Sequence, residues 1–479
     1  YDVDILIHSH EERDPQWADQ LLEQDRFHMF DLKNAVPWRA QLIHLREKEW
    51  MLLLNIHHII FDGWSVAIFW KELSEFYNSL QNGKEIVEDS DTSAIQYADY
   101  SIWQRKRLQG DVLEAGLQYW TELLTSAPAE LNFPTSKTRP RELTYRGRTC
   151  RTVLPRNCVE SLRSIGESEG CSFFSTVLAM LAALLSRYSG QTDIVIGTPV
   201  ANREVQNSEN LIGFFVNTLA LRLQFNAENT FCDLLKQAAT VTANALAHQD
   251  IPFEFLVDRL HLERHLNRSP LFQVMLVHQA SVGGSPEILF NGLSSEMLNT
   301  YSAAAKFDQT WEVREERDGS VSLHLNYATD LFNDDYAMAI FSVFEKLCYN
   351  ISEHKEKALA SIPLLCGEPL ELVQSWGTGL SRPNHAHQTL HQRLQITAQQ
   401  CGNSVALGMG SLIMTYAELE MSANALQKKL LTMGVARGMM VPLCSEVCFE
   451  MFIGALAIMK CGAAYVPMDP KIPLTRMEY

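Results

Sequence analysis

Two adjacent histidines, His57 and His58, are the residues of this sequence best placed to do chemistry. They follow an apolar stretch, residues 50–56, that predicts a β-strand, and they precede Asp62 and Gly63, whose types favour a turn and a helix start. Successive side chains of a strand point to opposite faces, so one imidazole can pack inside while the other faces a cavity. Titratable groups at such a strand end indicate a candidate active site.

The histidine pair also admits two other interpretations. Such a pair can be purely structural, because both ring nitrogens readily find hydrogen-bond partners. Histidine and carboxylate side chains can also bind a metal ion, and three further patterns could contribute ligands: His8-Ser9-His10, His248-Gln249-Asp250 and His385-Ala386-His387. The sequence ties none of the three to the pair, and no H-E-x-x-H pattern occurs, so we expect no metal site.

The stretch from His57 to Ser65 fits the pattern HHxxxDG of the condensation domains of nonribosomal peptide synthetases. Further segments resemble motifs of that family and occur in the family's order: Tyr97–Arg105, Gly197–Arg203, Ile212–Leu219, His248–Phe253 and Arg268–Gln273. An ordered series is far more specific than one short motif. The chain is therefore identified as similar to a condensation domain over roughly residues 1–365.

The fold expected from the sequence is of the α/β class, because predicted helices alternate with predicted strands from about residue 150 to 363. The resemblance implies two lobes, each similar to chloramphenicol acetyltransferase, that form a V with a tunnel between them. We expect the first lobe at residues 1–125 and the second at 126–365. The family's opening motifs have no counterpart before the histidines, so we expect a truncated first lobe in a piece of a longer protein.

A stretch rich in Gly, Pro, Ser and Asn follows, and residues 366–387 are assigned to a linker. Residues 388–479 resemble the start of an AMP-binding adenylation domain, with Met414–Leu419 and Met459–Asp469 similar to its first two motifs. The sequence stops at Tyr479, before any glycine-rich phosphate loop or later catalytic lysine. This α/β remnant is therefore expected to be unable to activate an amino acid.

The resemblance also implies roles for the site residues. The second histidine of the motif is the family's catalytic position, so we expect His58 to project toward the tunnel as the catalytic residue. His57 is expected to be buried and hydrogen-bonded inside. The Gly63 backbone and Asn217 are implied as groups of the tunnel wall, although Asn217 can equally be structural.

Asp62 is not expected to touch the substrate. A buried carboxylate needs a partner, and Arg203, which follows a predicted strand of the second lobe, is the candidate across the lobes. In the alternative, Asp62 caps a helix that is expected to start near Ser65. Both interpretations give Asp62 a structural role in support of the histidines.

The reaction implied by the resemblance is amide formation, in which the α-amine of an acceptor aminoacyl thioester attacks a donor aminoacyl or peptidyl thioester. Upstream and downstream peptidyl carrier domains deliver both on 4′-phosphopantetheine, so no cofactor is expected to bind directly. ATP and Mg²⁺ would serve only a complete adenylation domain, whose remaining part is a further expected partner. The sequences of Ile212–Asn217 and His57–Ser65 resemble those of condensation domains that accept an L-configured donor.

Other functions fit these motifs less well. An epimerization domain tends to continue the histidine motif in a Ser-Trp order, whereas this sequence has Trp64-Ser65, and it normally precedes a condensation domain. A coenzyme A-dependent acyltransferase carries a single histidine in the form HxxxDG, and a heterocyclization domain replaces the histidines with aspartates. A non-catalytic platform that docks or recruits carrier domains is the alternative from a different class.

Composition limits the remaining classes, and a length of 479 residues suggests about three structural units. The formal net charge of -17 argues against a nucleic-acid partner, which needs a basic face. The longest apolar run, residues 173–185, is shorter than the ~20 residues of a bilayer crossing, so we expect a buried helix and no membrane partner. Ten dispersed cysteines without a CxxC pair are typical of reduced thiols in a cytoplasmic protein.

Overall fold

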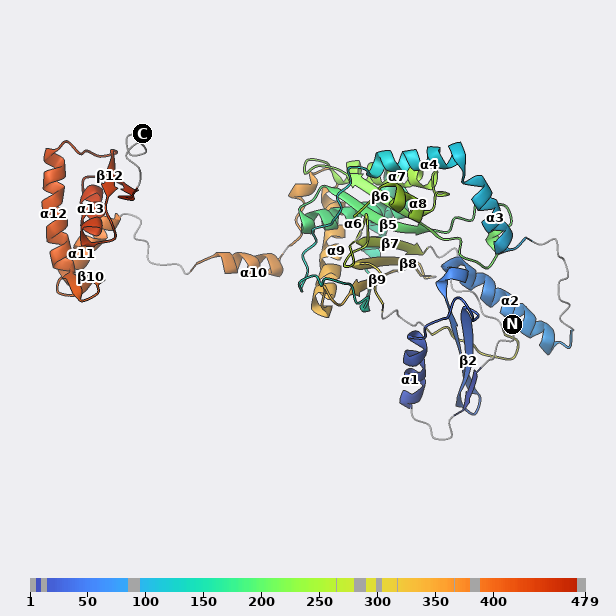
Figure 1. Ribbon diagram of the computed structural model, residues 1–479. Coiled ribbons are helices and arrows are strands. Elements are labelled where there is room, and N and C mark those ends of the chain that lie inside the picture. Colours follow the sequence, from blue (N-terminus) through green and yellow to red (C-terminus); the bar gives the residue numbers. More distant parts are fainter. Residues whose placement is uncertain are drawn as a thin grey trace. The chain divides into compact units, whose positions relative to one another are not determined.

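The computed structural model describes residues 6–9, 15–84, 95–263, 265–279, 290–298, 304–316, 318–365, 367–379 and 388–471. The chain forms two compact units, Tyr1–Glu371 and Leu372–Tyr479, and Figure 1 labels many of their helices and strands. All candidate site residues lie in the first unit. The α/β class expected from the sequence is confirmed, since helices and strands occur in both units.

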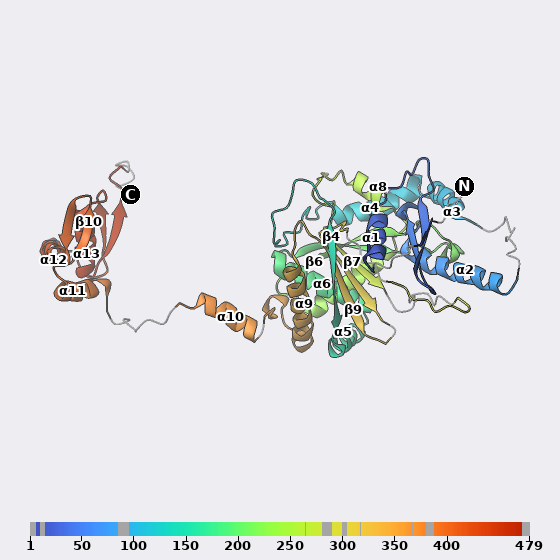
Figure 2. The same cartoon turned by 90° about the horizontal axis from the view of Figure 1, so that it is seen from below.

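A three-stranded sheet opens the first unit, in the order β1-β2-β3. Strand β1 (Leu6–Ser9) runs parallel to β2 (Trp38–Arg46), which pairs antiparallel with β3 (Glu49–Ile56). Figures 1 and 2 show this sheet between α1 (Pro15–Arg26) and α2 (Gly63–Gln81). We call these elements the first lobe. Its last strand delivers the chain directly to the histidine pair.

A six-stranded sheet forms the centre of the second lobe, in the order β4-β9-β8-β7-β5-β6. Neighbours β5, β7 and β8 are parallel, and the other pairs are antiparallel. The strands are β4 (Gly147–Leu154), β5 (Asp193–Val200), β6 (Asn217–Gln224), β7 (Val274–Gln279), β8 (Gln309–Glu315) and β9 (Val321–Ala328). The loop between β5 and β6, together with the first residue of β6, carries the second lobe's share of the candidate site.

Helices pack on this sheet around a single large apolar core. They are α4 (Gly110–Leu124), α5 (Arg156–Ser168), α6 (Phe173–Ser189), α7 (Phe231–Leu246), α8 (Phe253–Arg259) and α9 (Asp334–His354). Ser172 caps the start of α6, and Gly190, at φ 74°, ends it in the left-handed conformation that favours glycine. Every residue from 175 to 185 of α6 is buried, so the longest apolar run of the sequence is a core helix, as predicted.

The helix α3 (Tyr97–Arg107) leads from the first lobe toward α4. The apolar residues Leu117, Trp120 and Leu124 of α4 belong to the core of the second lobe, although the sequence assigned residues 1–125 to the first. The core of the second lobe therefore already includes α4. The domain limits themselves remain predictions.

The second unit contains two small sheets. Strands β10 (Val405–Met409) and β11 (Leu412–Thr415) are antiparallel, and β12 (Met440–Cys444) and β13 (Ala464–Met468) are parallel. The helices α11 (Leu390–Gln400), α12 (Tyr416–Thr432) and α13 (Phe449–Lys460) accompany them. Within the predicted linker 366–387 the structure has a helix, α10 (Glu368–Gly377), none of whose residues is buried. Glu368 and Glu371 in its first turn favour the helix electrostatically, which the loose composition concealed.

Of the helices described, none has by itself the length and apolar character of a membrane span; α5 and α6 pass that test only as a pair bent by 108°. Nine cysteines lie in the described part of the chain, and all are free thiols.

Candidate functional site

The histidine pair lies where the first lobe's sheet ends. The His57 amide donates to the Pro37 carbonyl at 2.8 Å, and its backbone is still extended. His58 already belongs to a short 3₁₀ helix, His58–Ile60. His57 caps this helix, because its Nδ1 accepts a hydrogen bond from the Ile59 amide at 3.1 Å. The strand alternation used to separate the two rings therefore stops at His57, and the 3₁₀ turn, not the strand, orients His58.

The two imidazoles have different surroundings. His57 is half-buried, with its ring edge-to-face against Phe30 at 6.0 Å between centroids, so the prediction that it is buried is wrong. It is hydrogen-bonded, as expected. His58 is exposed, and its ring meets the ring of Phe214 from the second lobe edge-on, at 5.2 Å and 88°. His58 thus stands at the junction of the lobes.

Asp62 is buried, at 3% exposure, and caps α2. Its Oδ1 accepts hydrogen bonds from the Ser65 amide at 2.9 Å and the Ser65 hydroxyl at 2.7 Å. The helix therefore begins at Gly63, two residues before the expected start. The positive end of the helix dipole also stabilises the negative charge of a capping carboxylate, so this local arrangement is favourable without any other partner.

Arg203 provides Asp62 with a second, long-range partner. Its Nη2 lies 2.9 Å from Oδ1 and 3.1 Å from Oδ2, and the two side chains are 3% and 2% exposed. Its Nη1 donates to the carbonyls of Ser208 and Leu211, each at 2.6 Å, and the guanidinium lies 4.1 Å from the Phe215 ring centroid. The predicted ion pair therefore forms, and the capping alternative is realised together with it.

Three side chains earlier in the chain hold Gly213–Phe215, which we call the strap. Ser65 Oγ accepts a hydrogen bond from the Gly213 amide at 3.1 Å, and the Tyr97 hydroxyl donates one to the Phe214 carbonyl at 2.8 Å. Asp62 Oδ2 accepts a hydrogen bond from the Phe215 amide at 3.0 Å. The sequence indicated Ser65 only as part of a helix start and Tyr97 only as part of a family-like motif, and it predicted neither contact with the strap. The partners lie 148 and 117 residues away and are backbone groups, which leave no signal in a sequence.

Electrostatics keep the strap's tyrosine contact in its donor form. Burial raises the pKa of Tyr97, and the nearby charge of Asp62 raises it further. Burial likewise raises the pKa of Tyr100, whose ring packs on Phe215 at 4.6 Å, to about 12. Both hydroxyls therefore remain protonated at neutral pH, and Tyr97 can donate to the strap throughout the physiological range.

Gly63 is exposed, and a Cβ placed on it would meet no atom within 4 Å. Its backbone is not in the left-handed region. Neither packing nor conformation requires glycine at this position, which leaves open space beside the start of α2.

Asn217 is a structural tie. Its Nδ2 donates to the carbonyls of Gln249 and Ile251, each at 2.7 Å, and its Oδ1 accepts from the amides of Thr218 at 2.8 Å and Phe253 at 3.1 Å. The side chain is buried and holds the turn before α8 against β6. These contacts favour the structural alternative that the sequence left open.

The tie predicts a stability effect. Asn217→Ala should lower the free energy of unfolding by about 1–3 kcal/mol, because it leaves buried backbone groups without a partner. Urea denaturation followed by circular dichroism measures this. The exposed Asn34→Ala, whose amide contacts only Asp31 at the surface, is the control and should change stability by less than ~0.5 kcal/mol. Equal effects of the two substitutions would contradict the structural role.

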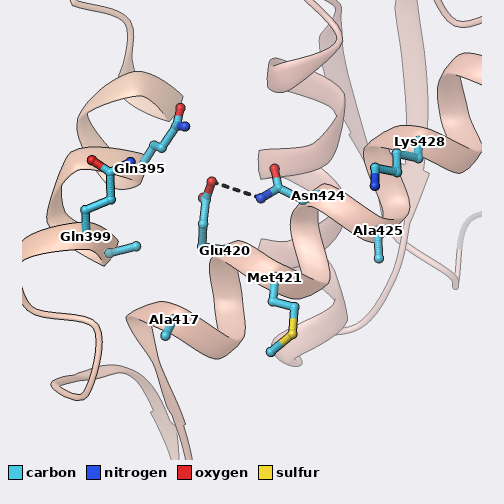
Figure 3. Close-up of a pocket in the computed structure, with 9 residues that line it drawn as sticks. Gln395, Gln399, Ala417, Glu420, Met421, Asn424, Ala425 and Lys428 are labelled. Carbon is cyan, nitrogen blue, oxygen red and sulfur yellow. Dashed lines mark hydrogen bonds between the residues drawn. The ribbon is translucent and has the colours of Figure 1, made fainter.

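Two cavities lie outside the histidine motif. One, of about 370 Å³, is lined in part by Tyr100 and Trp103 of α3 together with Asn202 and Asp250. The other, of about 750 Å³, lies in the second unit between α11 and α12 (Figure 3). There Asn424 Nδ2 donates to Glu420 Oε1 at 3.2 Å. No candidate site residue lines either cavity.

Among the residues that the structure describes, no group of three or more His, Cys, Asp or Glu side chains is arranged to hold a metal ion. Of the three histidine patterns considered from the sequence, His10 and His385-Ala386-His387 lie outside the described residues.

Comparison with families of known proteins divides the chain as its structure does. Residues 1–368 match the family model described as "Condensation domain". Residues 394–479 match the model described as "AMP-binding enzyme".

Individual relatives agree with the family models. One component of the linear gramicidin synthase of Brevibacillus parabrevis is 36% identical over 484 residues, which cover 100% of this chain but only 6% of that protein. A four-domain nonribosomal peptide synthetase bound to AMP and glycine has a TM-score of 0.78 at 22% identity, covering 100% of this chain and 36% of that one. The X-domain from teicoplanin biosynthesis, in complex with OxyB, has a TM-score of 0.68 at 26% identity, covering 77% and 80%.

Proposed function

We propose, since this chain belongs to the condensation-domain family of nonribosomal peptide synthetases, that its first unit joins two aminoacyl groups by an amide bond. The α-amine of an acceptor thioester attacks the carbonyl carbon of a donor thioester. A C–N bond forms, the C–S bond breaks, and the amine proton passes by way of His58 to the departing thiolate. Upstream and downstream carrier domains present both thioesters on phosphopantetheine, so this chain needs to hold no cofactor.

The position of His58 carries this proposal. Its imidazole is exposed at the lobe junction, beside Phe214. Asp62 is buried with both oxygens bound to neighbours, and His57 uses Nδ1 to cap the 3₁₀ turn. Among the titratable side chains of the motif, His58 is therefore the one able to meet a substrate at the junction.

Energetics assign His58 an orienting and proton-transfer role. An α-amino group has a pKa of ~7.7–8.0, so a useful fraction is neutral at pH 7 without help. Holding two reactants in line can contribute ~7–11 kcal/mol, whereas general base catalysis typically gives ~100- to 10,000-fold. We infer that His58 orients the amine and takes its proton as the charged tetrahedral intermediate collapses, and that positioning is the larger contribution.

The finer assignments follow from the resemblance. The first lobe is proposed at residues 1–125, the second at 126–365, a linker at 366–387 and the start of the AMP-binding domain at 388–479. The donor is proposed to be L-configured and the protein cytoplasmic, with neither nucleic acid nor membrane as a partner. ATP and Mg²⁺ would act only with the remaining part of the AMP-binding domain, a further proposed partner.

The open space beside Gly63 gives a prediction. Gly63→Ala should leave the melting temperature unchanged or slightly higher, because alanine favours a helix, while amide formation falls by ~10- to 100-fold, because a methyl group enters the path of the substrate. Thermal melting and initial rates measure the two effects. Gly377→Ala is the matched control, since it too has open space and no left-handed backbone. Full activity of Gly63→Ala would argue against a tunnel wall at Gly63.

A non-catalytic platform is the second candidate, and one observation favours it. The X-domain, similar to this chain at a TM-score of 0.68, is seen in complex with another protein, OxyB. A fold of this type can therefore serve as a docking surface. On this alternative the chain would bind loaded carrier domains without joining their aminoacyl groups.

The experiment that separates the two candidates incubates the 479-residue chain with one carrier domain bearing a labelled donor thioester and another bearing an acceptor thioester. Catalysis predicts a labelled dipeptide that appears only when both loaded carriers are present. Binding of the carriers without any dipeptide would support the platform and overturn the proposed reaction.

A further inference from the structure

The strap places one aromatic ring at the candidate site. Its backbone is bound at three consecutive residues by Ser65, Tyr97 and Asp62, as described above. Because bonds on both sides fix the main chain of Phe214, this residue cannot retreat from the junction without breaking at least one of them. The backbone position from which the Phe214 ring extends is therefore fixed, unlike that of a residue in a loop without such hydrogen bonds.

The ring of Phe214 is directed at the proposed catalytic group. Its centroid lies 5.2 Å from that of His58, and the planes are nearly perpendicular, at 88°. The residue is 36% exposed, so part of its apolar surface remains accessible beside the imidazole. Its carbonyl is already bound by Tyr97. What its side chain offers to a substrate is shape and apolar contact.

We propose that Phe214 is a specificity-determining residue, whose ring limits the size of the side chain that an aminoacyl thioester can place beside His58. This inference rests on the proposed function and names the group that selects its substrate. Tyr97 acts through Phe214 as a positioning residue, because its hydroxyl holds the carbonyl of the strap. Differences of one methylene in an apolar pocket change kcat/KM by about 10- to 200-fold, so a rigid ring can discriminate strongly.

The test compares acceptor and donor thioesters with alanyl and leucyl side chains, each varied against a fixed partner. In Phe214→Ala, kcat/KM for the leucyl substrate relative to the alanyl one should rise by about 10-fold or more in one of the two series. Phe214→Leu, which keeps apolar volume without a ring, should shift the ratio less and serves if the alanine variant does not fold. Phe255→Ala, a similarly exposed phenylalanine on α8, should leave the ratio unchanged.

The positioning role of Tyr97 has its own readout. Tyr97→Phe removes only the hydroxyl. It should shift the leucyl-to-alanyl ratio of kcat/KM in the same direction as Phe214→Ala does, while the melting temperature changes little. Tyr349→Phe also removes a hydroxyl that is hydrogen-bonded, to Asn157 at 3.0 Å, and should not move the ratio. Equal ratios for Tyr97→Phe and the unaltered chain would overturn the positioning role.

Binding of stable aminoacyl-pantetheine amides with the same two side chains separates this inference from the proposed reaction. If the unaltered chain forms no amide but Phe214→Ala still shifts the binding ratio toward leucyl, the reaction fails and the role of Phe214 stands. If the ratio is the same in variant and unaltered chain, the inference is overturned whether or not an amide forms. Failure of both analogues to bind the unaltered chain would contradict both proposals.

Discussion

Replacing His58 with alanine is expected to lower amide formation between two loaded carrier domains by ~100-fold or more, the size of a proton-transfer or intermediate-stabilising contribution. The melting temperature should stay close to that of the unaltered chain, because the His58 ring is exposed and makes one edge contact, with Phe214. Initial rates of dipeptide formation and thermal melting, measured on the same preparation, give the two quantities.

The neighbouring histidine provides the matched control. His57→Ala should lower stability, because the ring caps the 3₁₀ turn through the Ile59 amide and packs against Phe30. It should slow amide formation less than His58→Ala does, although it lowers the melting temperature more. A loss of only a few-fold in His58→Ala would mean that positioning by the tunnel walls carries the reaction.

Acceptors whose amines differ in basicity distinguish proton transfer from orientation. If His58 takes the amine proton, the ratio of the His58→Ala rate to the unaltered rate should depend on the basicity of the amine. Identical ratios for every amine would leave only an orienting role for His58.

Asp62→Ala is expected to lower the free energy of unfolding by ~3–5 kcal/mol, the typical cost of removing one partner from a buried ion pair. The substitution leaves Arg203 buried and charged, and it also removes the cap of α2 and the acceptor for the Phe215 amide. Urea denaturation measures the loss. Activity should fall largely in proportion to the folded fraction, because Asp62 is buried with both oxygens bound to neighbours and is not expected to contact the substrate.

An exposed ion pair provides the control for Asp62. Arg156 and Glu160 lie 3.0 Å apart on α5 with side chains 88% and 65% exposed, so Glu160→Ala should cost less than ~1 kcal/mol. A double-mutant cycle with Arg203→Met should show strong coupling, since the second substitution removes the charge that the first leaves unpaired. If Asp62→Ala melts like the unaltered chain yet loses all activity, the structural role is wrong.

The parts of the site that local chemistry decides can be predicted from the sequence. The ion pair between Asp62 and Arg203 is predictable because a buried carboxylate needs a partner, and the two lie 2.9 Å apart. The sequence Asp-Gly-Trp-Ser indicates that Asp62 caps the start of α2. The buried helix α6 follows from an apolar run that is too short for a membrane and apolar on every side.

The remaining features depend on contacts that no local pattern encodes. The sequence places Ser65 at a helix start, yet its hydroxyl also accepts from the Gly213 amide, a backbone group that every non-proline residue carries. His57 is only half-buried because the chain leaves the strand for a 3₁₀ turn after it, and alternation no longer applies. The helix α4 belongs to the core of the second lobe because its apolar side packs with residues that lie much later in the sequence.

The measurement that tests the central claim most directly is the intact mass of both carrier domains after one turnover with this chain. Because the acceptor amine attacks the donor carbonyl, the acceptor carrier should gain the mass of the donor acyl group, and the donor carrier should return to its free thiol. Substitution of His58 by alanine should slow both changes together. Unchanged masses of both carriers, or release of the donor as free acid without any gain on the acceptor, would contradict amide formation at this site.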